Sequence, residues 1–281
     1  MSIEQANCIR RFKRICGDGY DQGWHERNGG NLTYRMNRED IDVCMPYFDL
    51  DEPNGHEHQW HQMPVQADNL AGAFFITTGA GKYMRKVNID LMENVGIVEI
   101  NAAGDAWRIV WGLTGGGQPT SEFPTHFMNH SVRMDATNDE NRVIYHAHCP
   151  NVTALSMLLE PTSREWSRTL WRTMIECILV FPEGVGVVPW MVPGGAMIAS
   201  NTSVQMAKFP ACVWTQHGLF VSGESFDAAF GLMHTIEKTA QMYLTARAAS
   251  GGQEPEFMMN DAQLKEVCKY SGVKPNLEFL D

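Results

Sequence analysis

The sequence predicts an αβ fold built on one central sheet, and three observations support this prediction. Short β-branched and aromatic runs alternate along the chain with longer segments in which apolar residues recur at helical spacing. The chain has 281 residues, 44% hydrophobic and 20% charged, which suits a folded protein with a sizeable core. No internal repeat, low-complexity tract or clear linker divides it. We therefore expect a single domain over residues 1–281.

The N-terminal half predicts one helix followed by strands. Apolar residues at three- and four-residue steps over 3–24 are typical of an amphipathic helix. Residues 37–70 show little periodicity and are rich in Asp, Pro and His, so we interpret them as an irregular surface segment. Strands are expected directly after the turn Asn28–Asn31 and at 73–78, 95–100 and 106–112.

The C-terminal half predicts more helices than strands. The segment Pro119-Thr120-Ser121-Glu122 resembles a helix start, with Thr or Ser as the cap and the helix continuing to about residue 136. The expected strands are 142–148, short apolar runs at 177–181 and 185–189, and a pair across 211–222. The other expected helices lie near 151–159, 163–176, 195–208, 225–249 and 260–271.

Composition excludes several classes of function. The net charge is −11 and basic residues are not clustered, which argues against a nucleic-acid groove but leaves room for one small phosphate. Seven scattered cysteines without a CxxC pair indicate free thiols in a reducing compartment. The N-terminus lacks the pattern of a signal peptide, and no run of eighteen apolar residues occurs. We expect a cytoplasmic protein that acts on a small molecule, without nucleic acid or membrane.

The most informative residues are His146 and His148, in a predicted strand, together with His217 in a second strand pair. Side chains two apart on a strand project from the same face, so the first two imidazoles can share one ion. Three imidazoles bind a divalent transition metal and leave a position open for substrate. Taken alone, His146 and His148 fit a metal site and a chance pair of histidines equally well.

Other histidines and one cysteine have simpler interpretations. His56, His58 and His61 lie close in sequence but have no rigid frame, so a solvated loop is favoured over a metal site. Cys149 is favoured as a small core residue rather than a ligand. His126 is interpreted as a structural histidine.

Glu122 adds a carboxylate to the metal hypothesis. A glutamate beside three neutral imidazoles can be a fourth ligand or a base that moves a carbon-bound proton, while the metal polarises a carbonyl. At a helix start, glutamate alone more often serves the helix dipole. The candidate anion-binding groups are the turns Asn28-Gly29-Gly30-Asn31 and Gly79-Ala80-Gly81-Lys82 and the hydroxyls of Thr120 and Ser121. Each turn alone is more simply a plain turn, because neither matches a complete nucleotide fingerprint.

Several segments together resemble the class II, zinc-dependent sugar-phosphate aldolases over nearly the whole chain. They are Gly-Trp-His-Glu-Arg-Asn-Gly-Gly-Asn-Leu-Thr, Trp-Gly-Leu-Thr, Pro-Thr-Ser-Glu-Phe-Pro-Thr-His-Phe, His-Ala-His, and Phe-Pro-Glu-Gly-Val-Gly-Val-Val-Pro-Trp-Met-Val-Pro-Gly, in this order. The resemblance is greatest to members that cleave rhamnulose 1-phosphate. It implies a three-layer αβα fold with a mixed, mostly antiparallel sheet, and a homotetramer with sites at subunit interfaces.

The resemblance also implies roles for individual residues. It implies one Zn²⁺ per subunit on His146, His148 and His217, and it implies that Glu122 is the catalytic carboxylate. Asn28, Asn31, Gly81, Thr120 and Ser121 match positions that hold the substrate phosphate, and Glu176 matches a glutamate that reaches a neighbouring subunit's site. The implied reaction is reversible cleavage of L-rhamnulose 1-phosphate to dihydroxyacetone phosphate and L-lactaldehyde in rhamnose degradation.

Departures and rivals are limited. Ala80 stands where the family pattern has serine, and residues 37–70 have no clear counterpart. Related pentulose-phosphate 4-epimerases have a segment like Ser-Ser-Asp-Thr-Pro-Thr-His where this chain has Thr-Ser-Glu-Phe-Pro-Thr-His. The glutamate at position 122 therefore favours an aldolase. The tryptophan-rich segments 107–113 and 181–194 favour rhamnulose over fuculose phosphate as substrate. A non-enzymatic domain like the adducin head would have lost metal ligands, and all three are present.

Overall fold

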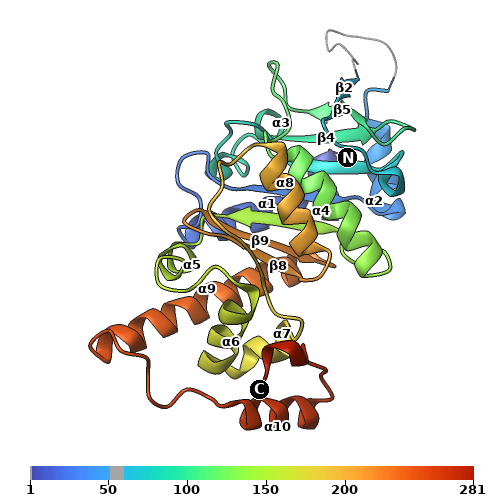
Figure 1. Ribbon diagram of the computed structural model, residues 1–281. Helices are drawn as coiled ribbons and strands as arrows, with labels where there is room; N and C mark the ends of the chain where they lie inside the picture. The colour runs from blue at the N-terminus through green and yellow to red at the C-terminus, as the bar shows by residue number, and fades with distance from the viewer. Residues whose placement is uncertain (1, 51–59) are drawn as a thin grey trace.

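The computed structural model describes residues 2–50 and 60–281 and has the three-layer αβα arrangement that the family resemblance implied (Figure 1). The strands form one sheet in the order β2-β5-β4-β3-β1-β6-β9-β8-β7. Neighbouring strands are antiparallel except β7 and β8, which pair in parallel. The strands are β1 Asn31–Arg35, β2 His61–Gln62, β3 Phe74–Thr78, β4 Val95–Ile100, β5 Ala106–Gly112, β6 Val143–Ala147, β7 Gly186–Val188, β8 Ala211–Trp214 and β9 Gly218–Gly223.

Helices cover both faces of the sheet. The α-helices are α1 Asn7–Asp21, α2 Arg38–Cys44, α3 Leu91–Asn94, α4 Phe123–Ala136, α5 Pro150–Leu155, α6 Ser163–Thr173, α7 Ile175–Val180, α8 Ala196–Met206, α9 Phe226–Ala249 and α10 Asp261–Ser271. Short 3-10 helices lie at Ile3–Gln5, Met45–Tyr47, Asp68–Leu70, Met84–Lys86 and Leu277–Phe279. None of the helices in the described part of the chain combines the length and apolarity needed to cross a membrane.

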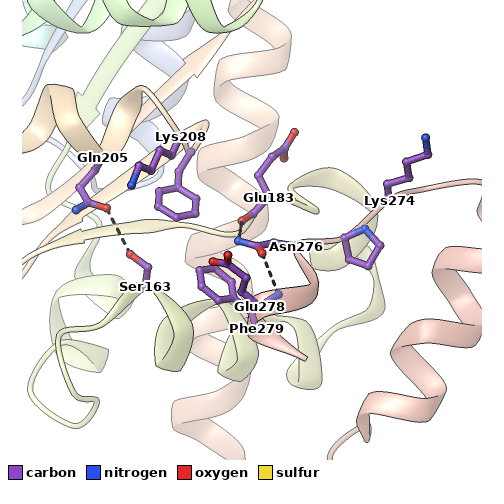
Figure 2. Close-up of a pocket in the computed structure, with 10 residues that line it drawn as sticks. Ser163, Glu183, Gln205, Lys208, Lys274, Asn276, Glu278 and Phe279 are labelled. Atoms are coloured by element: carbon purple, nitrogen blue, oxygen red, sulfur yellow. Dashed lines mark hydrogen bonds between the residues drawn. The ribbon is translucent and has the colours of Figure 1, made fainter. Parts of the chain in front are cut away.

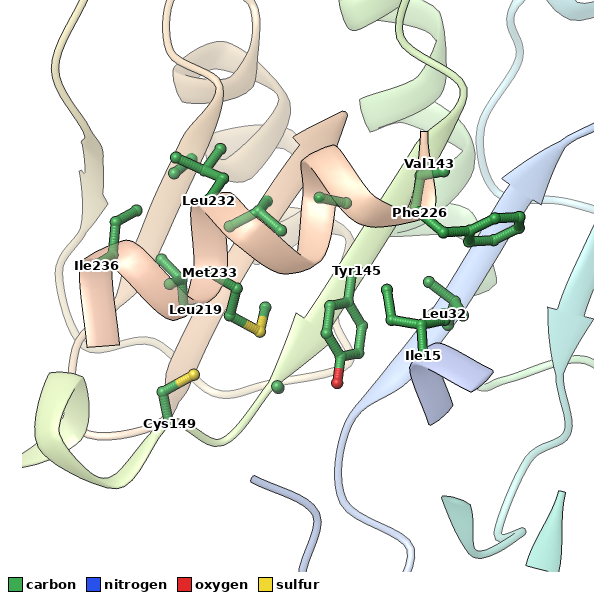
Figure 3. Close-up of a cluster of buried hydrophobic side chains, with 14 of the residues drawn as sticks. Ile15, Leu32, Val143, Tyr145, Cys149, Leu219, Phe226, Leu232, Met233 and Ile236 are labelled. Atoms are coloured by element: carbon green, nitrogen blue, oxygen red, sulfur yellow. The ribbon is translucent and has the colours of Figure 1, made fainter. Parts of the chain in front are cut away.

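Strand β6 shows how alternation assigns residues to the two faces. Val143 and Tyr145 belong to the same buried core as Leu232 and Met233 of α9 (Figure 3). Ile144 belongs to a second apolar cluster with residues of α8, β8 and β9, on the face covered by α4 and α8. His146 has the same parity as Ile144, so its ring faces the α4 side and stacks on Phe220.

Three expectations for local structure were wrong. Residues 37–70 contain α2, because Asn37 caps it by accepting from the Asp40 amide at 2.8 Å. The apolar run 177–181 lies mostly within α7 rather than in a strand. Helix α4 has Glu122 at its N-cap with no side-chain capping bond, so neither Thr120 nor Ser121 serves as the cap.

Antiparallel pairing brings three segments to one end of the sheet. Asn31, the first residue of β1, pairs with His146 near the end of β6. The amide of Leu32 donates to Thr78 Oγ1 at the end of β3. The candidate site lies at this end.

Candidate metal centre

The three predicted ligands meet where β6 ends and β9 begins. His146 lies in β6, and His148 follows directly after the strand. His217 lies in the tight turn between β8 and β9 rather than in a strand, which corrects the sequence expectation. A Cβ on Gly218 would stand 2.4 Å from the Ala147 carbonyl oxygen, so only glycine allows the turn to approach β6 this closely.

The imidazoles of these three histidines, here called the histidine cluster, are arranged as metal ligands. Each offers one nitrogen, and these atoms lie within 4.8 Å of one another. His148 Nε2 and His217 Nε2 are 3.1 Å apart. Among the described residues no other group of three or more His, Cys, Asp or Glu side chains meets this geometry.

Hydrogen bonds at the far side of two rings direct lone pairs into the cluster. His146 donates from Nδ1 to the Leu219 carbonyl at 3.1 Å, which leaves Nε2 as a lone pair. His148 Nδ1 lies 2.6 Å from Glu26 Oε1, so this ring also directs Nε2 inward. His146 Nε2 is buried and has no partner among the described residues. A buried lone pair without a donor is costly, and a metal ion satisfies it.

Burial keeps His146 and His217 neutral, as metal binding requires. Burial and the neighbouring His148 hold the pKa of His146 well below its ordinary value. The same two causes lower the pKa of His217 to about 4. At neutral pH both rings therefore present free electron pairs.

Glu122 lies beside the cluster, as predicted. Its Oε2 is 3.8 Å from His146 Nε2 and accepts from Asn31 Nδ2 at 2.9 Å. Burial raises the pKa of this carboxyl. A carboxylate partly withdrawn from water at this distance can reach a metal ion or a proton on a ligand held by it.

The predicted phosphate residues come from three segments at the same end of the sheet. Asn28 is exposed in the turn after Glu26, whereas Asn31 is buried against Glu122. The Ala80 amide donates to the Gln118 carbonyl at 2.8 Å, which ties the turn containing Gly81 to the segment with Thr120 and Ser121. Ser121 is exposed and Thr120 buried.

Glu176 is not brought to the cluster within one chain. It lies exposed in the first turn of α7, which packs against α6, α9 and α10. Of the histidine-rich loop, His56 and His58 fall outside the described residues. His61 in β2 stacks on Trp107 in β5, and the three strands β4, β3 and β1 lie between β5 and β6, so this histidine is remote from the cluster.

Sequence analysis assigned no part in the site to Glu26, His130 or Thr33, and it interpreted His126 only as a structural histidine. Glu26 was within a recognised motif, yet its contact with His148 depends on a fold that joins positions 122 apart. His126, His130 and Thr33 form a buried hydrogen-bonded group behind Asn31. The i, i+4 spacing of the two histidines on α4 was the available signal.

A separate cavity of about 550 Å³ lies away from the cluster, between α6, the end of α8 and the C-terminal segment (Figure 2). Lys208 and Lys274 line it together with Glu183 and Glu278, so its charges balance. It contains none of the histidine cluster, and the metal centre remains the candidate site.

Comparisons with known proteins agree with one another. The family model for the class II aldolase and adducin N-terminal domain matches residues 10–244. A rhamnulose-1-phosphate aldolase from Pectobacterium atrosepticum is 40% identical over 95% of this chain and 94% of its own length. Another from Listeria monocytogenes serotype 4b is 37% identical over 99% and 98%. The crystal structure of a sugar-phosphate aldolase from Thermotoga maritima superposes with a TM-score of 0.69, at 26% identity over 88% of this chain and 97% of that one.

Proposed function

The chain belongs to the family of class II aldolases and adducin N-terminal domains, and we propose that its histidine cluster and Glu122 form the active site. The chain is an aldehyde-lyase that cleaves L-rhamnulose 1-phosphate reversibly to dihydroxyacetone phosphate and L-lactaldehyde. Relatives with that name match it over nearly their full length. The observation that carries the assignment of the site is the buried, unpartnered Nε2 of His146 beside two further inward-facing imidazoles.

We propose Zn²⁺ as the ion on His146, His148 and His217, one per subunit. A bound divalent metal supplies charge that polarises the substrate carbonyl and stabilises the developing enediolate. The donor set fits such an ion, because neutral imidazoles suit zinc and its neighbours in the transition series. Glu26 orients the His148 ring and makes that ligand more basic.

Glu122 is proposed to move the proton. In the condensing direction it removes a proton from the hydroxymethyl carbon of dihydroxyacetone phosphate, and in cleavage it returns the proton to that carbon. Asn31 holds Oε2 of this carboxylate through its amide. No lysine Schiff base is needed, because a divalent metal held by the three histidines would serve as the electron sink.

The remaining assignments are also proposals. Asn28, Asn31, Gly81, Thr120 and Ser121 would surround the substrate phosphate, since all lie on the segments that meet at the cluster's end of the sheet. A cytoplasmic homotetramer in which Glu176 contributes to a neighbouring subunit's site would explain why that residue is exposed on α7.

The test is carbon–carbon bond formation by the zinc-loaded protein with dihydroxyacetone phosphate and L-lactaldehyde, followed by identification of product stereochemistry. Chelator-treated protein is the control and should be inactive until zinc is restored. Absence of any condensation product from the loaded protein would refute the proposed function. A fuculose-configured product would instead assign the chain to a different substrate.

A further inference from the structure

A chain of buried polar side chains leads from α4 to the carboxylate of Glu122. Asn31 donates from Nδ2 to Glu122 Oε2, and its Oδ1 contacts His126 Nε2. The other nitrogen of that ring, Nδ1, lies 2.8 Å from Thr33 Oγ1. Thr33 Oγ1 lies equally close to His130 Nε2. Of these, Thr33, His126 and His130 are at most 1% exposed, so water is not available as an alternative partner.

Counting donors and acceptors fixes the direction in which each hydrogen bond of this series is donated. An ionised Glu122 can only accept, so Asn31 must present its amide nitrogen there and its oxygen to His126. His126 therefore carries its proton on Nε2. Burial lowers the pKa of His126 to about 3, so the ring is neutral and Nδ1 accepts from the Thr33 hydroxyl. That hydroxyl has one proton, and its oxygen accepts from His130 Nε2.

We propose that Thr33, His126 and His130 are positioning residues that fix the side-chain amide of Asn31 so that it always donates to Glu122. An asparagine amide has nearly the same shape when turned by 180°, and only its hydrogen bonds choose between the two orientations. The reversed amide would direct Oδ1 at the carboxylate and repel it. The inference rests on the proposed role of Glu122 as the base.

The other tautomer of His126 would give the opposite orientation of the Asn31 amide. The carbonyl of Ile144, which pairs with Thr33 across the sheet, is a second acceptor near His126. If His126 carried its proton on Nδ1 and gave it to this carbonyl, Nε2 would accept from Asn31 Nδ2. Asn31 would then turn its oxygen to Glu122, and the direction of the whole chain would be reversed.

The principal test compares Thr33→Val with Thr33→Ser in the zinc-loaded full chain. Valine keeps the shape of threonine and removes only the hydroxyl, whereas serine keeps the hydroxyl. We expect Thr33→Val to slow exchange of the dihydroxyacetone phosphate proton in D₂O by about tenfold or more, the usual effect of losing an orienting partner behind a metal site. Zinc per chain should stay at the wild-type level, and Thr33→Ser should recover most of the rate.

If Thr33→Ser slows proton exchange as much as Thr33→Val does, the inference is overturned, because the effect would then come from packing rather than from the hydroxyl. The inference would also be overturned if Thr33→Val exchanged the proton at a rate within about twofold of wild type, because the expected slowing is about tenfold or more. His126→Gln, whose amide nitrogen can donate to Asn31, should likewise retain more activity than His126→Leu.

The second measurement is independent of activity. Nitrogen-15 chemical shifts of the imidazole rings in the zinc-loaded protein report which nitrogen carries the proton. We expect His126 and His130 both to be protonated on Nε2, and an Nδ1 proton on His126 would overturn the inference. If the wild-type protein shows no proton exchange, the proposed function fails, while the tautomers still decide the direction of the hydrogen-bond chain.

Discussion

Replacing Glu237 with glutamine should destabilise the protein, although Glu237 is not among the residues proposed to bind metal or substrate. Glu237 lies in α9 and is 5% exposed. Its Oε1 accepts from the backbone amide and the side-chain amide of Asn151, at 3.0 and 2.7 Å, and Oε2 accepts from the amide of Val152 at 2.9 Å. It thus holds the first turn of α5, which begins two residues after His148.

The magnitude follows from these three hydrogen bonds. Glutamine can keep the two bonds to Asn151 through its oxygen, although without the charge. Its NH₂ group then faces the Val152 amide, so that buried donor is left unsatisfied. Losing one bond to a charged acceptor and weakening two others costs about 2–4 kcal/mol. For a chain of this size that free energy corresponds to a fall in Tm of roughly 3–7 °C.

Thermal and urea denaturation in the presence of chelator measure this cost without a contribution from bound metal. The matched control is Glu266→Gln, because Glu266 is exposed on α10 and should change stability by less than about 0.5 kcal/mol. A Glu237→Gln protein with the same Tm as this control would refute the reasoning that the buried carboxylate holds α5.

Three further predictions concern the metal centre and pH. Glu122→Gln should slow proton exchange of dihydroxyacetone phosphate by about 10²- to 10⁴-fold, while zinc analysis still finds metal bound; unchanged exchange would remove Glu122 from the mechanism. His217→Ala should lose zinc, and with it the stabilisation of about 2.7 kcal/mol that zinc at a hundredfold excess over Kd gives the wild type; an equal stabilisation of the variant would argue against this ligand. Burial lowers the pKa of His25 and His217 to about 4 and of His126 to about 3, from 6.5. Because the unfolded chain binds more protons below pH 6.5, metal-free protein should lose stability as the pH falls from 6.5 towards 4, by about 1 kcal/mol per pH unit for each buried histidine. Urea titrations at pH 7 and 5 test this, and equal midpoints would contradict it.

The sequence predicted most of the sheet and the long helices. The strands at 73–78, 95–100 and 106–112 and the helices near 225–249 and 260–271 were confirmed to within a residue or two. Their periodicity is strong because each buries one face against a common core. Long amphipathic patterns are therefore readable without knowing their partners.

The errors lie where local preference and tertiary packing disagree. The apolar run 177–181 was predicted as a strand, yet most of it lies in α7, where Cys177 and Ile178 are buried. Cys177 Sγ also contacts Thr239 Oγ1 of α9 at 3.1 Å. Short apolar runs do not distinguish a strand from a buried helix, and the surrounding elements decide between them.

The sequence by itself determined the chemistry of the site, because residue types fix what a side chain can donate, accept or ligate. The sequence predicts His146, His148, His217 and Glu122 as site residues, and the structure brings all four together. Only the tertiary structure decided which lone pairs point inward and what holds the base. Those properties depend on contacts such as Glu26 with His148 and Asn31 with Glu122, which join positions about a hundred residues apart. Hydrogen-bond direction is a property of the packed neighbourhood, so it becomes visible only once the chain has folded.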